Sequence, residues 1–312
     1  MALYRRAIDA HLHCRETGGG PRVMLLHCSA GSGAQWRTLA SQLAAHFRVL
    51  APDLAGYGAS PARAQGDFAT LTGHALALAR LVDAEPGPLH LVGHSFGGAV
   101  ALRLAMLLGE RVCSLSLIEP VAFQLLRGAG GDAGAYAVVR GIARAMAADL
   151  SAGNGAAAMH RFVDFWNGEG NWAAMDGDRR AQLAAQAAQV VADFDAIEAE
   201  PTRRAALRAI SAPTLVLQGG RSPAPAALAV RRVAEAIPGA QRVRLRDAGH
   251  MAPLTHAEMV NLLLTAHLEL AQERARGRRN RTHGARLARE TTPAADPIRR
   301  HGARPQRPII AA

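Results

Sequence analysis

Short apolar runs alternate along this chain with longer segments in which apolar residues recur at helical spacing. Most of the runs are continuous rather than alternating, which is the pattern of strands buried on both faces of a parallel sheet. The helix-like segments between them supply the long crossovers that parallel strands require. The pattern therefore predicts an α/β fold with a doubly wound, mainly parallel sheet. The expected strands cover residues 22–27, 47–51, 89–92, 112–118, 214–218 and 241–246.

One junction between a predicted strand and a predicted helix carries a G-x-S-x-G motif. Gly93, Ser95 and Gly97 lie between the apolar run 89–92 and a helical pattern that begins at Ala99. A turn that lifts a serine hydroxyl out of the fold is very tight, and glycines two residues before and after it provide the room. Backbone N–H groups at the start of the helix would favour negative charge on a reacting oxygen. The motif predicts that Ser95 is a nucleophile.

A serine nucleophile needs a general base, and His250 is the candidate. It follows the half-exposed strand pattern of residues 241–246 in a Gly-His setting, so its imidazole can swing into a site at the same sheet edge. Imidazole titrates near neutral pH without help, which suits proton transfer in both directions. Among the other histidines, we expect His94 to support the elbow without taking part in the chemistry.

The order of four motifs resembles the α/β-hydrolase superfamily, in the branch that carries a helical cap. The resemblance spans residues 20–270, which is most of the chain. It implies a mainly parallel sheet, a triad of serine, acid and histidine, and an oxyanion hole near the first motif. The four motifs are, in chain order, Leu25 to His27, residues 52–60, Gly93 to Gly98, and Gly249 with His250.

The acid of the implied triad is where this sequence departs from the commonest family pattern. Many relatives carry an aspartate in a Gly-x-x-Asp turn after the strand that corresponds to residues 214–218, and here Ser222 holds its place. A serine cannot stabilise an imidazolium as a carboxylate does. The next acidic residue, Glu235, lies inside the following predicted helix. The acid must therefore come from another loop at the same edge, or the triad is incomplete.

Glu119 is the substitute that the sequence favours. It ends the apolar strand 112–118, and Pro120 stops that strand directly behind it. Some members of the superfamily place their acid at this strand end, where the carboxylate could accept the Nδ1–H of His250 and fix its tautomer. Two other interpretations stay open. Glu119 could instead cap a helix or pair with an arginine, and Asp247 could provide the acid.

Acyl transfer also needs hydrogen-bond donors aimed at the oxyanion. The elbow makes the backbone N–H of Phe96, the residue after the nucleophile, one donor. The resemblance puts the second donor in the loop 27–33, where relatives commonly have glycine after the histidine and this chain has Cys28. We assign the second donor to the N–H of Ser29, with the N–H of Cys28 as the alternative.

The segment 121–211 differs in composition from the rest of the chain. It is rich in alanine, has no obvious core strand, and holds seven of the thirteen aromatic residues. We expect a helical cap over the catalytic edge that excludes water and presents an apolar wall to substrate through Phe162, Trp166 and Trp172. Alternatively, these aromatic residues form the core of the cap itself. The predicted domains are a hydrolase core of residues 1–120 and 212–272, the cap of residues 121–211, and a tail of residues 273–312.

The positive charge of the chain is concentrated at its C-terminus. The formal net charge is +11, and residues 273–312 contain eleven arginines against three acidic residues. This segment is rich in Pro, Arg and Gly and has almost no apolar periodicity, so we expect a basic, disordered tail. Nucleic-acid binding is not favoured, because no aromatic side chain in the tail can stack on bases.

The remaining composition favours a soluble cytoplasmic protein without a membrane partner. No uninterrupted apolar run is long enough to cross a bilayer, and the N-terminus has no secretory apolar segment before Asp9. Three cysteines, Cys14, Cys28 and Cys113, lack the spacing of metal ligands and favour reduced thiols over disulfides. We expect no metal and no cofactor.

These features predict a cofactor-free serine hydrolase that cleaves an ester-like bond of a small, apolar substrate through an acyl-enzyme. Serine rather than aspartate at the elbow argues against dehalogenase and epoxide hydrolase chemistry. Carbon–carbon bond hydrolysis stays open. So does a non-catalytic member of the fold that binds a small ligand, which the absence of an aspartate at position 222 makes plausible.

Overall fold

The computed structural model describes residues 12–61, 69–83, 85, 87–128 and 132–290 of the 312-residue chain. The chain divides into two units, Met1–Gln272 and Glu273–Ala312. The first unit contains all the described strands and the candidate site.

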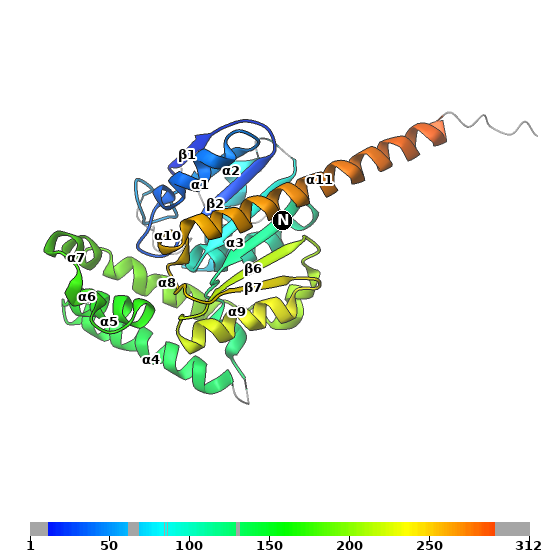
Figure 1. The fold of residues 1–312 in the computed structure, drawn as a ribbon. Coiled ribbons are helices and arrows are strands. Elements are labelled where there is room, and N and C mark those ends of the chain that lie inside the picture. The colour runs from blue at the N-terminus through cyan, green and yellow to red at the C-terminus, as the bar shows by residue number, and fades with distance from the viewer. Residues whose placement is uncertain (1–11, 62–68, 84, 86, 129–131, 291–312) are drawn as a thin grey trace, which may run out of the picture. The chain divides into compact units, whose positions relative to one another are not determined.

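A seven-stranded sheet forms the centre of the first unit, with strand order β1-β3-β2-β4-β5-β6-β7 (Figure 1). Five of its six pairings are parallel, and only β1 runs antiparallel to its neighbour β3. The doubly wound, mainly parallel sheet expected from the sequence is confirmed. The strands are β1 (Cys14–Thr17), β2 (Arg22–Leu26), β3 (Arg48–Pro52), β4 (Leu89–His94), β5 (Val112–Ile118), β6 (Thr214–Gly219) and β7 (Gln241–Leu245).

The edge strand β1 was not predicted, because its residues carry no strand signal. Its four residues, Cys14 to Thr17, are polar apart from the cysteine, and three of them are exposed. The strand forms because its backbone pairs with β3, from Cys14 opposite Pro52 to Thr17 opposite Val49. Backbone pairing with β3, rather than the pattern of its own side chains, therefore determines strand β1.

Each face of the sheet has its own apolar core, because successive side chains of a strand point to opposite faces. Val23 and Leu25 of β2 pack with helix α1 (Arg37–Leu43) and with the first part of helix α11 (Ala257–Glu290). Met24 and Leu26 pack on the other face with α2, α3 and α9. Both central strands, β2 and β4, are buried along their whole length, which explains their continuous apolar runs. The helices of this second face are α2 (Leu71–Asp83), α3 (Phe96–Leu108) and α9 (Ala224–Ala236).

Within the described residues, five α-helices lie between β5 and β6 in the sequence and form the predicted helical insertion. Figure 1 shows them in green, gathered on one side of the sheet. Polar side chains start two of them: Asn154 accepts a hydrogen bond from the N–H of Ala157, and Asp176 accepts one from the N–H of Arg179. They are α4 (Asp132–Ser151), α5 (Gly155–Asn167), α6 (Asn171–Ala174), α7 (Gly177–Ala184) and α8 (Ala187–Ala199).

Short helices complete the connections of the fold. The single-turn helix α10 follows the loop that carries His250, and the short η2 follows the loop after β2. These helices are η2 (Gly33–Trp36), η3 (Gly109–Arg111), η4 (Phe123–Leu126), η5 (Arg204–Ala209) and α10 (Ala252–Thr255).

The last helix differs from the disordered tail that the sequence predicts. Helix α11 runs through position 273 and ends at Glu290, so residues 273–290 are helical rather than disordered. Arginine, alanine, leucine and glutamate are good helix formers, and the first proline of this segment comes only at Pro293. Local propensity therefore supports a helix where apolar periodicity is absent. The rest of the predicted tail, residues 291–312, lies outside the described residues.

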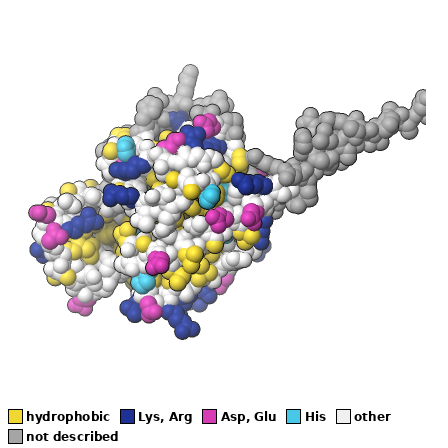
Figure 2. Space-filling model, turned by 45° about the horizontal axis from the view of Figure 1, so that its top comes forward, with side chains coloured by type: hydrophobic (Ala, Val, Ile, Leu, Met, Phe, Trp, Pro, Cys, Tyr) yellow, Lys and Arg dark blue, Asp and Glu magenta, His cyan; other side chains and the backbone are white. Residues whose placement is uncertain are grey.

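The described surface mixes both signs of charge. Figure 2 shows arginine side chains interspersed with aspartate and glutamate over one face. Ion pairs of the described surface include Arg48 with Glu16 and Glu85, and Arg111 with Asp83. Within the described ranges, no helix is both long and apolar enough to span a bilayer, and no group of acidic, histidine and cysteine side chains could hold a metal ion.

Candidate active site

The turn between β4 and α3 places Ser95 in the strained conformation of a nucleophile elbow. Its φ is 54°, in the left-handed region that side chains rarely adopt. A Cβ atom at Gly93 would lie 2.4 Å from the carbonyl oxygen of Gly97, and one at Gly97 would lie 2.3 Å from that of His27. Both contacts are too short for any side chain. Glycine is therefore required at both positions of the G-x-S-x-G motif, because the neighbouring backbone segments lie too close for a side chain.

The side chains of Ser95, His250 and Glu119 form a hydrogen-bonded chain. Nε2 of His250 lies 2.9 Å from Oγ of Ser95, and its Nδ1 lies 3.2 Å from Oε2 of Glu119. All three residues are buried, with exposed fractions of 5%, 3% and 1% for Ser95, His250 and Glu119. A carboxylate only accepts, so Nδ1 carries the proton and Nε2 is left to accept the proton of the serine hydroxyl. This is the polarity that a general base requires.

Glu119 is fixed by the end of the neighbouring strand β6. Its Oε1 accepts a hydrogen bond of 2.7 Å from the N–H of Gly219, and its own N–H donates to the carbonyl oxygen of Leu217. Its φ is 48°, which turns the side chain out of the line of β5. The carboxylate is thus held between His250 and β6, rather than serving as a helix cap or pairing with an arginine.

The alternative acid, Asp247, lies away from the imidazole. Its side chain is 79% exposed and pairs with Arg221 at 3.1 Å. Ser222, at the position where many relatives carry the acid, is not among the contacts of His250, and its buried hydroxyl makes no hydrogen bond within the described residues. The structure thus brings Glu119, and not Asp247, to the histidine.

Backbone strain is concentrated at this site. Three non-glycine residues of the described chain have positive φ, and they are Ala30, Ser95 and Glu119. Ala30 belongs to the loop after β2, Ser95 is the elbow serine, and Glu119 carries the carboxylate that contacts His250. Such conformations cost about 1–3 kcal/mol each and persist where the surroundings impose them. The site is therefore held in place before any substrate arrives.

The loop after β2 lies against the elbow, as an oxyanion hole requires. A Cβ atom at Gly97 would meet the carbonyl oxygens of both Leu26 and His27, so the two backbones are in close contact. The N–H of Cys28 donates to Oε1 of Gln35 at 3.1 Å, whereas the N–H of Ser29 donates to no acceptor in the described part of the chain. Ser29 is therefore better placed than Cys28 to offer a free donor beside that of Phe96.

A chain of hydrogen bonds connects this loop to the elbow and to the loop that carries His250. Nε2 of Gln35 lies 3.1 Å from Nδ1 of His94, and Nε2 of His94 lies 2.9 Å from the carbonyl oxygen of His250. The carbonyl oxygen of His250 only accepts, so Nε2 of His94 donates to it and Nδ1 of His94 carries no proton. This Nδ1 therefore accepts a hydrogen bond from the NH2 group of Gln35. The amide oxygen of Gln35 then accepts from the N–H of Cys28. Burial, and then the neighbouring His250, lower the pKa of His94 to about 3, which keeps the ring neutral. His94 thus supports the site structurally, as expected from its place in the motif.

The helical insertion covers the imidazole of His250. The indole of Trp166 stacks on the imidazole of His250 with 3.7 Å between ring centroids, and Phe162 meets Trp166 edge-on. Trp172, which the sequence analysis also placed against substrate, does not line the cavity. It stacks on His160 within the insertion instead. Clustering in sequence could not separate these cases, because Trp166 lies on α5 and Trp172 on the separate short helix α6.

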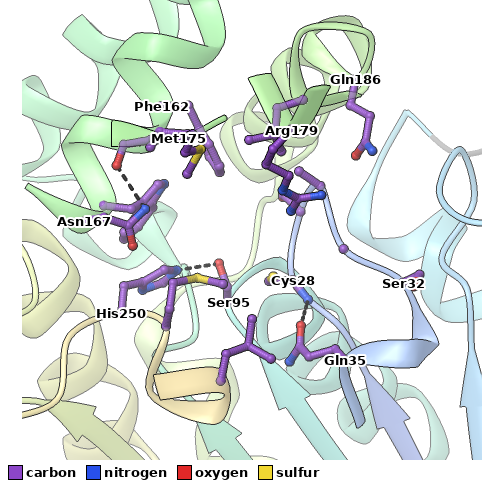
Figure 3. A pocket seen from close by; sticks show the side chains of 18 of the residues that line it. Cys28, Ser32, Gln35, Ser95, Phe162, Asn167, Met175, Arg179, Gln186 and His250 are labelled. Atoms are coloured by element: carbon purple, nitrogen blue, oxygen red, sulfur yellow. Dashed lines mark hydrogen bonds between the residues drawn. The ribbon is translucent and has the colours of Figure 1, made fainter. Parts of the chain in front are cut away.

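A cavity of about 400 Å³ opens beside Ser95 between the insertion and the sheet (Figure 3). Its volume lies within the range of small-molecule sites. Cap residues form an apolar wall, and polar side chains from both the core and the cap complete the lining. No local sequence pattern pointed to Gln35, Asn167, Arg179 or Gln186, because their position here depends on tertiary packing. The residues of the apolar wall are Phe162, Val163, Trp166, Met175 and Leu183.

A smaller adjoining void contains a buried carboxylate that sequence reasoning missed. Asp193 of α8 lines it together with Ser29 and Ser95. Its Oδ2 accepts hydrogen bonds of 2.7 Å from the hydroxyl of Ser29 and 2.6 Å from that of Tyr57, and its Oδ1 accepts one from Gln189. The cap is therefore hydrogen-bonded directly to the loop that carries the candidate oxyanion donor.

The family of the chain follows from comparison with known proteins. The model of the alpha/beta hydrolase fold family matches residues 21–257. This chain belongs to that family. Among solved structures, it is similar to a hydrolase from Pseudomonas aeruginosa PA01, with 26% identity and a TM-score of 0.66 over 83% of this chain and 94% of that one. It is also similar to a thermophilic esterase from Thermogutta terrifontis, with 25% identity and a TM-score of 0.67 over 85% and 96%.

Two curated relatives match shorter stretches of the chain. Lipase LipV of Mycobacterium tuberculosis is 40% identical over 114 residues, which are 36% of this chain and 42% of that protein. The pimeloyl-[acyl-carrier protein] methyl ester esterase of Aeromonas salmonicida is 43% identical over 98 residues, 31% of this chain and 37% of that protein. The chain thus spans about two fifths of the length of these two relatives.

Proposed function

We propose that this protein is a serine hydrolase that cleaves an ester-like bond of a small substrate through an acyl-enzyme. The observation that supports this most is the buried chain from Ser95 through His250 to Glu119, with hydrogen bonds of 2.9 and 3.2 Å. The two similar relatives whose names describe a lipase and a methyl ester esterase also favour ester chemistry.

In the first half of the proposed reaction, Oγ of Ser95 attacks the carbonyl carbon while Nε2 of His250 takes the hydroxyl proton. The negative charge that develops on the carbonyl oxygen is stabilised by the N–H groups of Phe96 and Ser29, each worth about 3 kcal/mol of barrier. The tetrahedral intermediate then collapses. The bond to the alcohol breaks, and the alcohol leaves with the proton from Nε2.

In the second half, water attacks the acyl carbon and gives its proton to Nε2 of His250. Collapse releases the acid, and the proton returns to Oγ of Ser95. In both halves Glu119 compensates the positive charge of the imidazolium and holds its Nδ1–H. Trp166 covers one face of the imidazole, which restricts the access of bulk water.

A non-catalytic ligand-binding protein is the alternative from a different class of function. The strained backbone conformations of Ser95 and Glu119 favour catalysis. Each such conformation costs about 1–3 kcal/mol, and a site that only binds a ligand gains nothing from a serine held in this way. Turnover of 4-nitrophenyl esters of graded chain length distinguishes the two functions and reports the depth of the cavity. Hydrolysis by the wild type that is lost in Ser95→Ala supports the proposal, and equal rates for the two proteins contradict it.

A further inference from the structure

The cavity beside Ser95 has an uneven distribution of charge. Among the described residues that line it, Arg179 of α7 is the one arginine or lysine. His250 also lines the cavity, but it belongs to the proposed catalytic chain. No aspartate or glutamate is among the lining residues. Arg179 is exposed, so its charge lies at the mouth of the cavity, opposite the buried end where Ser95 is found.

The guanidinium of Arg179 is available for a ligand. Figure 3 shows it pointing into the cavity, toward Cys28. Within the described residues, its one hydrogen bond is a long contact of 3.5 Å to Oε1 of Gln182, and no carboxylate pairs with it. Two other arginines of the cap are paired instead, Arg140 with Glu198 and Arg161 with Asp149.

The backbone of Arg179 is fixed although its side chain is not. Its N–H donates at 2.7 Å to Oδ1 of Asp176, the residue that caps α7. The helix therefore presents the side chain from a defined position above the cavity. A guanidinium held this way offers a planar set of donors that matches a carboxylate or a phosphate.

The negative charge of the site lies at the other end. Asp193 is 1% exposed and lines the small void beside Ser29 and Ser95, where three donors already engage it. An anionic group of a substrate is repelled from this buried end and attracted to the mouth. The charges thus favour a substrate with an anionic group, and they favour the orientation that places this group at the mouth of the cavity.

We propose that the preferred substrates are esters that carry an anionic group, a carboxylate in the simplest case, bound by Arg179 while the ester carbonyl reaches Ser95. The apolar wall of the cap, including Phe162 and Met175, covers the part of the substrate between the two ends. The amide of Gln186 and the hydroxyl of Ser32 also line the cavity and offer further donors. This inference rests on the proposed hydrolase function and specifies its substrate class.

Matched pairs of esters test this proposal. The first pair is mono-4-nitrophenyl adipate and 4-nitrophenyl hexanoate, whose acyl chains are equally long and differ in a terminal carboxylate. The second is 4-carboxyphenyl acetate and its methyl ester, which place the charge on the leaving group. In at least one pair, the anionic ester should have a kcat/KM about tenfold higher at low ionic strength. Added salt should reduce the preference, because Arg179 is exposed.

Variants at two adjacent positions assign the preference to its source. Arg179→Gln should bring the ratio of anionic to neutral kcat/KM close to one, and Arg179→Lys should keep part of it. Arg180→Gln is the matched control, since it removes the same charge from the same helix without touching the cavity. Its ratio should equal that of the wild type. A ratio near one in the wild type for both pairs, or equal ratios in the wild type and Arg179→Gln, would overturn the proposal.

A binding measurement keeps the inference separate from the proposed function. Calorimetric titration of Ser95→Ala with each ester gives its affinity without turnover. If the wild type hydrolyses none of the esters, the proposed function fails, and the inference is then decided by this titration alone. If Ser95→Ala binds the anionic esters more tightly than the neutral ones, and the double variant that also carries Arg179→Gln does not, the inference is supported. Equal affinities of Ser95→Ala for the anionic and neutral esters contradict it.

Discussion

Trp166 of the cap lies flat against the imidazole of His250, with 3.7 Å between the ring centroids and 23° between the planes. A favourable ring pair of this kind contributes about 1 kcal/mol beyond the burial of its surface. Phe162 and Phe165 hold the indole from its edges. The cap therefore helps to orient the imidazole of His250, the proposed general base, in addition to covering the cavity.

Replacing Trp166 with leucine should lower kcat/KM about tenfold, because the imidazole loses the ring that restrains it. Trp166→Phe keeps an aromatic face and should retain most of the activity. Trp172→Phe is the control, since Trp172 stacks on His160 away from the cavity. Hydrolysis of 4-nitrophenyl acetate measures all three variants. Full activity of Trp166→Leu would show that the stack has no catalytic consequence.

Glu119→Gln should reduce kcat by about three to four orders of magnitude, because the amide favours the wrong tautomer of His250 and cannot compensate the imidazolium. The circular dichroism spectrum should remain that of the wild type. Asp247→Asn is the matched control, because this exposed side chain is paired with Arg221. It should leave kcat unchanged. A neutral result for Glu119→Gln would remove Glu119 from the proposed triad.

Asp193→Asn should destabilise the protein by about 1–3 kcal/mol, because an amide whose oxygen accepts from Ser29 and Tyr57 turns its NH2 group toward the donor Nε2 of Gln189. It should also lower kcat, since Ser29 carries a proposed oxyanion donor. Urea denaturation and ester hydrolysis measure the two effects. Tyr57→Phe removes one donor and should reproduce part of the loss of stability. An Asp193→Asn variant as stable and active as the wild type would contradict the assigned role.

Acid should destabilise the folded chain through two buried histidines. Burial lowers the pKa of His27 to about 4, and burial with the neighbouring His250 lowers that of His94 to about 3, against an ordinary value of 6.5. Below the ordinary value the unfolded chain takes up protons that the folded chain does not. The free energy of unfolding should therefore fall, by a few kcal/mol, as the pH drops from about 6.5 through the folded pKa values.

Urea titrations at pH 7, 5.5 and 4 measure this dependence. Carboxylates can contribute in the same direction, so the comparison with His94→Asn isolates the part due to one histidine. This variant should lose less stability between pH 7 and pH 4 than the wild type does. Parallel curves for the two proteins would contradict a depressed pKa of His94.

Gln35→Glu should disturb the oxyanion loop in a pH-dependent way. The amide of Gln35 accepts from Cys28 and donates to His94, whereas a carboxylate can only accept. The connection to His94 then requires an added proton on the ring or on the carboxyl group, so kcat/KM relative to that of the wild type should recover as the pH is lowered. Gln35→Met, which has neither donor nor acceptor of this strength, should be impaired at every pH. Identical pH profiles for the two variants would exclude the proposed hydrogen-bond chain.

Much of the fold and part of the site could be predicted from sequence, because their signals are local. The elbow at Ser95 is a motif whose glycines are needed within a few residues, and the strand before Glu119 ends where Pro120 follows it. The edge strand β1 was missed because it is determined by pairing with β3. The helical segment 273–290 was missed because its residues have high helix propensity but no apolar periodicity.

The rest of the site depends on contacts between distant segments. Asp193 meets Ser29 across 164 positions of sequence, and no local pattern distinguishes it from any other aspartate on a helix. The same holds for Gln35, which reaches His94 only after the loop and the elbow have packed together. Trp166 and Trp172 are six positions apart but lie on different helices, α5 and α6, so their surroundings depend on how these helices pack and not on composition.

The most direct test of the central claim is labelling of the intact protein with a fluorophosphonate, read by mass spectrometry of the tryptic peptides. A serine activated by His250 at 2.9 Å should react, and the label should be found on the peptide that contains Ser95. Ser95→Ala should remain unlabelled, and Glu119→Gln should react far more slowly than the wild type. Labelling of Ser95→Ala to the extent of the wild type, or no reaction of the wild type, would contradict the account.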